Sequence, residues 1–572
     1  MFRQNHSHRQ IPLTSHVDEL PANLRKRLEN SWAGTFYREF FCRLDEKTFA
    51  TLYVDVPSRP NVPVNVLVGL EYLKAGNSWT DEEMYDHFCY DVQVRYAVGY
   101  RQLGEGYFDL RTLYYFRERL SRHMQEEGTN LLDQAFEQVT DKQIKAFGIK
   151  TGKQRMDSTQ LASNIRQMGR VQLLVEVLQR VHRMLNENDQ ARYADLFAGY
   201  MKGHAGQYVY RLKGEEIAGH LQRIGEDMYC LLAELREPYA SYPVYRVLER
   251  VFSEHFKLKE DKVNAKQSVE LSASSLQSPD DLEATYREKG GKGHQGYAAN
   301  VTETCDPKND LQLITKVQVA PNNTDDSKLL AEALPNLKER TEIDTVYTDG
   351  GHGSPQTDEV LKKHQVNQIQ TAIRGRQPDS ERMHLTDFDI QFDDTDKPQK
   401  ITCPYGQTVP VMRSVRRKAF ITTFDLSVCQ GCPMKDSCPS RPGKRDPRRR
   451  LRFTQVEANR AERRRRSEKY LRDGRNIRAA VEATMRSVKH PFPAGKLPVR
   501  GQFRVTCMVI GSAAMTNIRR IQRYLEAKSK SARSEKAIME KESTESDEKN
   551  VFLLILASLS TFRLKVRYIG VF

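Results

Sequence analysis

The amino-acid sequence predicts an α/β protein whose mixed β-sheet is interrupted by two inserts and preceded by an all-helical region. A short strand-like run at 154–159 is followed by helical periodicity from about 161 to 258. Three more strand-like runs come later, at 296–302, 311–319 and 342–348, and a short helix is predicted at 328–337. The order strand, strand, strand, helix, strand, with a long helical insert after the first strand, is typical of an α/β domain with a mixed sheet.

Residues 1–145 are predicted to be mostly helical. Apolar residues recur at helical spacing in two segments, Val66, Leu67, Leu70 and Leu73, and Leu113, Phe116, Leu120 and Met124. Thr80 and Glu83 have the spacing of a capping box, which marks the first turn of a helix. Two interpretations of this region remain open, a DNA-binding helical domain and a helical bundle without that role.

The later part of the chain changes composition several times. Residues 395–445 are rich in Cys, Pro and basic residues, and a helix is predicted from about 459 to 489, ended by Pro491 and Pro493. The stretch 526–550 is rich in Lys, Glu and Ser and is expected to be disordered or a loose helix. The sequence predicts three domains. Residues 1–145 form a helical region, and 146–525 form an α/β region with a helical insert at 161–280 and a Cys-rich insert at 395–445. Residues 526–572 form a charged linker with an apolar tail.

Positive charge is concentrated in one part of the sequence. The chain has a formal net charge of +15 and a pI of about 9.2. Between Arg441 and Arg478 there are 16 Lys or Arg and 5 Asp or Glu, a net charge of 16 − 5 = +11. Clustered arginines neutralise phosphates and release counterions, so this segment is expected to contact nucleic acid.

The sequence gives no sign of secretion or of a membrane span. Met1–Gln10 is polar, so no signal peptide is expected. The longest apolar run, Val551–Leu559, is about half of what spans a bilayer. Nine cysteines, an odd number with four close together, fit a reducing compartment better than a disulfide framework. The protein is expected to be cytoplasmic, with no membrane partner.

Three acidic residues stand in settings that suit a metal site. Asp157 belongs to a short strand, and Asp349 follows a strand and precedes two glycines that allow a tight turn. Glu482 lies in the predicted helix, where it shares a face with Arg478 and Lys489. Each acid alone is ordinary. The Gly-rich run 290–293 lacks phosphate-loop spacing, so a nucleoside triphosphatase is not indicated. No convincing Ser-His-Asp or Cys-His arrangement of a nucleophile is present either.

These residues carry a resemblance to a known family. The motifs are Met156-Asp157-Ser158-Thr159, Val346-Tyr347-Thr348-Asp349-Gly350-Gly351, Arg478-x3-Glu482-x6-Lys489 and Ala513–Arg520, together with Asp109–Arg117, Asp281–Arg287 and Asn322–Ser327. In this order they resemble the DDE transposases of bacterial insertion sequences, over about residues 60 to 525. Arg475 replaces the tyrosine of the family's Tyr-x2-Arg-x3-Glu-x6-Lys signature, and His352 stands where an aromatic residue is expected.

The resemblance implies a ribonuclease-H-like catalytic domain behind a transposase N-terminal helical domain. It implies cleavage of DNA at transposon ends and strand transfer into target DNA, with two Mg²⁺ (or Mn²⁺) ions. Asp157 would bridge both ions, and Asp349 and Glu482 would each bind one. Residues implied or expected to contact DNA are Arg478, Lys489, Arg475, Arg463, Arg464, Arg465 and Arg466. The resemblance also implies double-stranded DNA as partner, a homodimer in the DNA complex and association with the nucleoid.

A cysteine cluster predicts a second metal site. Cys403, Cys429, Cys432 and Cys438 have the spacing Cys-x25-Cys-x2-Cys-x5-Cys. A Cys-x2-Cys pair with two further thiolates can close a tetrahedral structural zinc site. An iron–sulfur cluster and four reduced thiols are the alternatives. The remaining five cysteines are expected to be ordinary core residues.

Two alternative functions remain open at this point. One is a DNA-binding regulator of transposition whose catalytic domain is degenerate, and the other is a ribonuclease-H-like nuclease. Retention of all three acids favours an active transposase over the first, and the basic run and large inserts exceed what a small nuclease needs.

Overall fold

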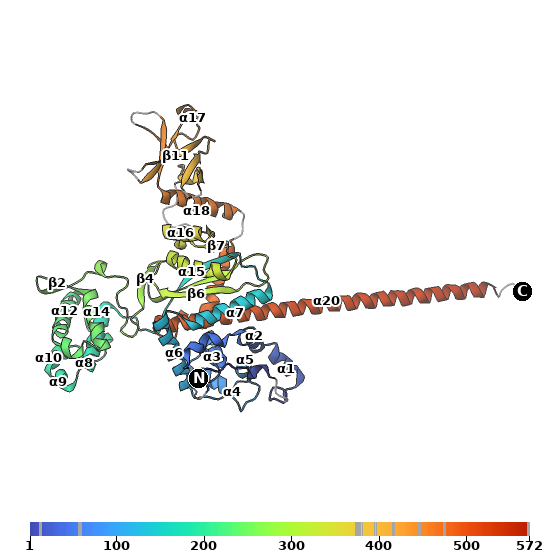
Figure 1. Ribbon diagram of the computed structural model, residues 1–572, viewed down its shortest axis with the longest axis horizontal. Helices are drawn as coiled ribbons and strands as arrows, with labels where there is room; N and C mark the ends of the chain where they lie inside the picture. The colour runs from blue at the N-terminus through green and yellow to red at the C-terminus, as the bar shows by residue number, and fades with distance from the viewer. Residues whose placement is uncertain are drawn as a thin grey trace.

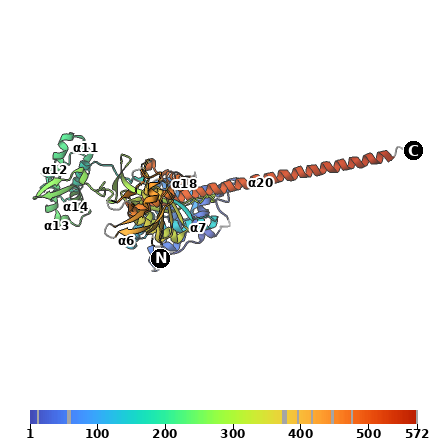
Figure 2. The same cartoon turned by 90° about the horizontal axis from the view of Figure 1, so that it is seen from above.

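The computed structural model describes residues 1–572 except 11–13, 55, 57–59, 372–378, 380, 394, 396, 415–417, 444–447, 473–475 and 569–572, and it describes no side chain at 471–472 or 536–568. The helical N-terminal region and the two inserts lie on different sides of a central sheet (Figure 1). A long helix extends away from this body (Figures 1 and 2).

The central sheet is mixed, as the sequence predicts. Its strands are β1 (Lys153–Leu161), β4 (Thr285–Lys289), β5 (Lys292–Thr304), β6 (Ile314–Pro321), β7 (Thr345–Thr348) and β8 (Asn367–Gln370). The order is β4-β5-β1-β7-β8, with β6 also paired to β5. β5 is antiparallel to β1, β4 and β6, whereas β1, β7 and β8 are parallel. The helices α15 (Asp326–Arg340) and α16 (Pro355–Lys363) follow β6 and β7.

The four predicted strands and the predicted helix between them are confirmed. The strands are β1, β5, β6 and β7, and the helix is α15, with ends that differ from the prediction by a few residues. The largest difference is β5, which begins at Lys292 because its first half pairs with β4 in a hairpin. The Gly-rich run 290–293 of this hairpin is visible in the sequence, but the pairing of β4 with β5 is not, because it depends on contacts between two segments.

The N-terminal region is helical, and its predicted capping box is present. Thr80 accepts a hydrogen bond from the Glu83 amide, and the Glu83 carboxylate accepts one from the Thr80 amide. The α-helices are α1 (Ala22–Glu29), α2 (Trp32–Glu39), α3 (Val64–Asn77), α4 (Asp81–Tyr90), α5 (Val92–Ala97), α6 (Arg111–Glu127) and α7 (Leu131–Phe147), with 3-10 turns η1 (Ser7–Arg9), η2 (Phe41–Arg43) and η3 (Glu46–Leu52). One hydrophobic core joins these helices to the sheet.

The long segment after β1 is a helical insert with its own core. Its elements are α8 (Arg170–Met184), α9 (Glu187–Arg192), α10 (Ala194–Phe197), α11 (Ala205–Tyr210), η4 (Gly214–Glu216), α12 (Ile217–Glu234), α13 (Arg236–Tyr239), α14 (Pro243–His255), β2 (Phe256–Lys259), β3 (Lys262–Ala265) and η5 (Ser268–Glu270). Leu174, Leu178 and Leu248 are among the apolar residues buried between its helices. The insert stands beside the sheet in both views (Figures 1 and 2).

The Cys-rich region contains a second sheet, which the sequence did not predict. Its elements are η7 (Leu385–Asp387), β9 (Asp389–Phe392), β10 (Pro398–Thr402), β11 (Thr408–Ser414), β12 (Ala419–Phe424), α17 (Leu426–Gln430), β13 (Arg441–Pro442) and β14 (Arg449–Phe453). The strand order is β13-β14-β12-β11-β10-β9, and every pairing is antiparallel. Phe388, Phe424 and Phe453 are buried in its core, which several of the cysteines contact.

The single helix predicted from about 459 to 489 is wrong. The chain forms α18 (Gln455–Arg472), the 3-10 turn η9 (Ile477–Ala479) and α19 (Ala480–Lys489). Asn476 marks the restart, since its side chain accepts a hydrogen bond from the Ala479 amide and caps the turn η9 that leads into α19. The apolar spacing of Ile477, Val481, Met485 and Val488 lies wholly after the interruption and therefore could not reveal it. The predicted end before Pro491 is confirmed.

The last element is the helix α20 (Gln502–Tyr568). Two further 3-10 turns are η6 (Gly350–His352), after β7, and η10 (Pro493–Gly495), after α19. The first part of α20 contacts α2, α3, α7 and β6, and its later part extends away from the body in both views (Figures 1 and 2). The stretch 526–550, expected to be disordered or a loose helix, belongs to this helix. In the described part of the chain, no helical segment is both long and apolar enough to span a membrane.

Candidate active site

Asp157 and Asp349 are brought to the same level of the central sheet. The parallel strands β1 and β7 pair in a register that places Arg155 opposite Tyr347. Asp157 lies two residues beyond Arg155, and Asp349 lies two residues beyond Tyr347. Because side chains alternate along a strand, this offset directs both carboxylates to the same face at neighbouring positions. The sequence placed Asp157 on a strand and Asp349 just after another, and the register makes them neighbours.

Asp157 is mostly buried and is paired with Arg478. Its side chain is 13% exposed, and its Oδ2 lies 3.1 Å from a terminal guanidinium nitrogen of Arg478. Its Oδ1 accepts a hydrogen bond from the Ser158 amide at 3.0 Å. Burial raises the pKa of Asp157, and the nearby charge of Asp349 adds to this effect, although Arg478 opposes it. Two carboxylates that repel each other in a buried setting favour a bound cation.

Asp349 caps a 3-10 turn and is held by a buried histidine. Its Oδ1 accepts hydrogen bonds from the Gly351 amide at 2.8 Å and from His352 Nδ1 at 2.6 Å. Burial raises the pKa of Asp349, but the hydrogen bond and charge of His352 outweigh burial, so the pKa lies well below its usual value. The side chain of His352 is fully buried. The sequence showed His352 only as a departure from a motif, whereas its position three residues after Asp349 lets it orient that carboxylate.

Glu482 lines the same pocket as the two aspartates. A pocket of about 550 Å³ is lined by the three acids and by Ser158, Thr159, Lys289, Arg478, Met485, Arg486, Lys489, His490 and Phe492. Glu482 is an exposed residue of α19. Among the described residues there is no group of three or more His, Cys, Asp or Glu side chains placed closely enough to hold a metal ion. The acids therefore share a pocket, and Arg478 occupies one oxygen of Asp157.

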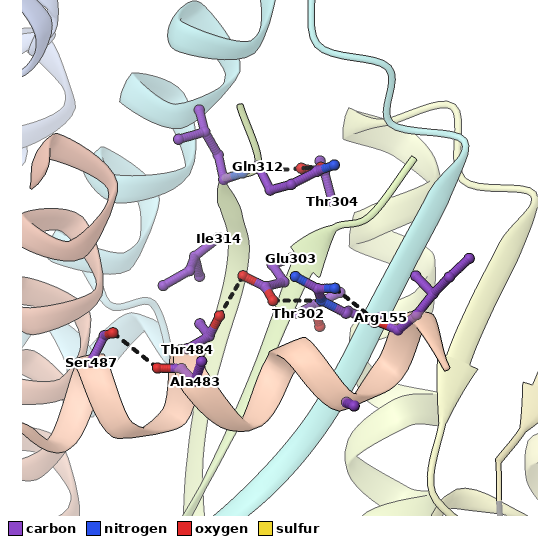
Figure 3. A network of polar contacts seen from close by, with 12 residues as sticks. Arg155, Thr302, Glu303, Thr304, Gln312, Ile314, Ala483, Thr484 and Ser487 are labelled. Atoms are coloured by element: carbon purple, nitrogen blue, oxygen red, sulfur yellow. Dashed lines mark hydrogen bonds and ion pairs between the residues drawn. The ribbon is translucent and has the colours of Figure 1, made fainter. Parts of the chain in front are cut away.

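A buried charge network fixes α19 against the sheet (Figure 3). Glu303, near the C-terminal end of β5, has a fully buried side chain and lies 2.6 Å from Arg155 Nε and 2.7 Å from Arg520. Its second oxygen also accepts a hydrogen bond from Thr484 of α19 at 2.7 Å (Figure 3). Arg155 in turn donates to the Ile477 carbonyl at 2.7 Å. This network holds both ends of the segment that carries Arg478 and Glu482, and nothing in the sequence pattern indicated it.

The predicted DNA contacts beside the acids have different settings. Lys489 Nζ lies in the pocket, 3.1 Å from the Gln160 carbonyl and 3.3 Å from Thr159 Oγ1, and burial lowers its pKa. Arg478 also lines the pocket. Arg475 lies outside the described residues. Three basic residues of the pocket, Lys289, Arg486 and His490, were not singled out from the sequence, because β4 and the end of α19 meet only in the fold.

The arginine run of α18 is largely engaged within the protein. Arg463 is paired with Asp358 of α16, and Arg465 Nη1 lies 2.6 Å from Asp389 of β9. Arg466 lies 3.1 Å from Glu462 on its own helix, and Arg464 is part-buried. These pairs attach α18 to the two layers beside it. Contact of this run with DNA stays a prediction.

The four clustered cysteines line one small cavity of about 30 Å³. Cys403 precedes the β10–β11 turn, Cys429 is in α17, and Cys432 and Cys438 follow it. All four are free thiols. As with the acids, the described residues do not form a ready metal-binding group here. Four soft thiolate donors around one cavity suit Zn²⁺ in kind.

Comparison with known proteins adds one finding. No significant match was found among curated proteins or among solved structures. A family model described as "Transposase DDE domain" matches residues 402–522. This stretch contains Glu482 and the four cysteines, but neither Asp157 nor Asp349. The matched part of the chain is thus similar to the DDE domain of transposases, a class of enzymes that cleave nucleic acid and generally use divalent metal ions.

Proposed function

We propose that this protein is a DDE transposase that cleaves DNA at transposon ends and joins them to target DNA. One observation carries the proposal: Asp157, Asp349 and Glu482, which are far apart in the sequence, line one pocket. The similarity of residues 402–522 to the transposase DDE domain supports the same function through Glu482. A ribonuclease-H-like fold is part of the proposal, supported by a mixed sheet with the first acid on its middle strand.

The proposed metal ions are two Mg²⁺ or Mn²⁺. Bound between the carboxylates, such ions activate an attacking oxygen and stabilise a leaving oxygen in an in-line displacement at phosphorus. Carboxylate oxygens are the donors that these hard cations prefer, and the mutual repulsion of Asp157 and Asp349 favours cation binding. The three carboxylates are the type of donor that these ions need. Metal binding through Asp157 Oδ2 requires that Arg478 move away from that oxygen.

The remaining pocket residues have roles that follow from charge. Arg478 and Lys489 would bind phosphate oxygens of the DNA strand, with Lys289 and Arg486 on the walls of the same pocket. His352 would hold Asp349 in its orientation through the bond to Oδ1. A single structural Zn²⁺ on the four cysteines and a homodimer in the DNA complex are further parts of the proposal.

DNA cleavage with matched variants tests the function. Duplexes that contain the ends of the element are incubated with Mg²⁺ and wild type, Asp349→Asn, Glu482→Gln or the control Asp344→Asn. Asp344 is exposed at the start of β7. We expect the first two variants to lose strand cleavage by roughly a thousandfold or more while still binding DNA, and the control to cleave like wild type. Equal product yields from wild type and Asp349→Asn would refute the catalytic assignment.

A DNA-binding regulator without catalysis is the second candidate. It is favoured by the ion pair between Arg478 and Asp157, which leaves the carboxylates without a ready metal-binding group. The same assay separates the two, since a regulator binds the ends but cleaves them with neither Mg²⁺ nor Mn²⁺. RNA–DNA hybrids as substrate separate a ribonuclease-H-like nuclease from both.

A further inference from the structure

A cavity of about 390 Å³, lined by apolar residues and a few polar side chains, lies where the helical insert meets strand β4. Its lining includes Arg170 of α8, His255 of α14, Ser275 and Leu276 of the segment after η5, and Tyr286 of β4. Neither the three acids nor the cysteine cluster belongs to it. The Tyr286 amide donates to the Ala273 carbonyl at 2.9 Å, which ties the segment after η5 to β4.

Several buried polar atoms of this cavity have no hydrogen-bond partner among the described residues. His255 is 4% exposed, and both of its ring nitrogens are unpartnered. Arg170 Nε and Ser275 Oγ, which are also buried, are unpartnered too. Unsatisfied buried polar atoms are costly and uncommon, so several of them around one cavity indicate a missing ligand or water molecules.

The charges around the cavity favour an anion. Arg170 uses its two terminal nitrogens to donate to the carbonyls of Lys266 at 2.6 Å and His255 at 2.7 Å. No carboxylate is found among the described residues that line the cavity. Burial, followed by the charges of Arg170 and Lys266, lowers the pKa of His255 to about 4. A site with a cation, no acid and neutral donors repels cations and attracts anions.

Two acidic residues close in sequence to the residues that line this cavity, Glu254 and Glu270, are paired with other groups. Glu254 lies 2.8 Å from Arg250 and accepts a hydrogen bond from the Leu276 amide at 2.8 Å. Glu270 lies 2.6 Å from Lys257. Neither carboxylate lines the cavity, so the charge of Arg170 is left for a ligand.

We infer that this cavity binds a phosphate group through Arg170, Ser275 and His255. The oxygens of a phosphate accept hydrogen bonds, and the Arg170 Nε–H, the Ser275 hydroxyl and one ring N–H of His255 are the free donors. The phosphate could belong to the DNA backbone or be free. Strand β4 favours DNA, because Tyr286 lines this cavity and Lys289 lines the active-site pocket, about 10 Å further along the strand. Only the choice of DNA rests on the proposed function.

The test measures phosphate binding without any cleavage. Full-length protein with ring-labelled histidine is titrated with inorganic phosphate and, separately, with a DNA duplex, both without divalent metal. His255→Gln identifies the His255 signal. Ser275→Asp places a carboxylate beside Arg170 and is compared with Ser241→Asp, which adds the same charge at an exposed position of the insert. Circular dichroism and thermal unfolding establish that each variant is folded.

We expect phosphate or DNA to shift the His255 signal of wild type and of Ser241→Asp. In Ser275→Asp we expect the binding of phosphate to weaken at least about fivefold. If DNA shifts the signal and phosphate competes with it, the ligand is a backbone phosphate. If only free phosphate shifts it, the cavity is a site for the free anion. An unmoved His255 signal with both probes, or equal binding by Ser275→Asp and wild type, overturns the inference. Asp349→Asn leaves this measurement unchanged, so failure of the catalytic assignment is recognised separately.

Discussion

Arg478 and Asp157 form an ion pair at 3.1 Å, with side chains only 14% and 13% exposed. The guanidinium therefore occupies one of the two oxygens through which Asp157 would bind a metal ion. A divalent cation and Arg478 cannot use Oδ2 at the same time.

Removing this guanidinium should strengthen metal binding while weakening catalysis. For Arg478→Gln we expect divalent metal to bind about tenfold more tightly, because a charge interaction of roughly 1.4 kcal/mol corresponds to that factor. Cleavage should fall, since the phosphate contact is lost. Binding of Mn²⁺ followed by electron paramagnetic resonance measures the first effect. The control is Arg486→Gln. Arg486 lines the same pocket, but the ion pair of Asp157 is with Arg478. Unchanged Mn²⁺ affinity in Arg478→Gln would contradict the competition.

His352 is predicted to act through Asp349. Its Nδ1 lies 2.6 Å from Asp349 Oδ1 and keeps the pKa of Asp349 low. His352→Ala should weaken metal binding by about 10- to 100-fold, the usual effect of removing a residue that orients a metal ligand. His352→Asn, which can still donate a hydrogen bond, should recover part of the loss. A Mg²⁺ titration of cleavage measures both, and a lower maximal rate with unchanged Mg²⁺ dependence would argue for a merely structural role.

Loss of the Glu303 carboxylate should destabilise the protein. Glu303→Gln leaves Arg155 and Arg520 without their shared buried counter-charge. Removal of one partner from a buried ion pair typically costs about 3–5 kcal/mol. We expect a clear fall in the midpoint of chemical unfolding, together with loss of cleavage because α19 is no longer held. Glu288→Gln, an exposed change on β4, should unfold like wild type. Equal stability of the two variants would show that the network contributes little.

The cysteine cavity should hold one zinc ion per chain. Metal analysis of purified protein is expected to give about one equivalent. Cys432→Ser should lose zinc and lower the unfolding temperature, whereas Cys230→Ser, outside the cluster, should retain it. Less than about half an equivalent in wild type, with four freely reactive thiols, would refute the site. An iron content with visible absorption would identify the iron–sulfur alternative.

Stability should fall on mild acidification because of His255. Its pKa is about 4 in the folded protein, against 6.5 for an ordinary histidine. For a base whose folded pKa is lowered, stability is fully present above pH 6.5 and is lost as pH falls from 6.5 to about 4. This loss is on the order of 3 kcal/mol. His255→Gln should flatten the unfolding free energy over this window, and the exposed His6→Gln should not. Parallel curves for wild type and His255→Gln would contradict it.

By itself the sequence determined the strand that carries Asp157 and the strand that Asp349 follows, because each is a short local pattern of residues. It also determined the capped helix at Thr80, whose two hydrogen bonds join residues three apart. It did not determine the break between α18 and α19, because the regular spacing of apolar residues begins only at Ile477, after the break. Long-range contacts decided the rest. The register of β1 against β7 makes Asp157 and Asp349 neighbours, and Glu303 ties α19 to them. Such relationships join segments more than a hundred residues apart, and only the folded chain brings them together.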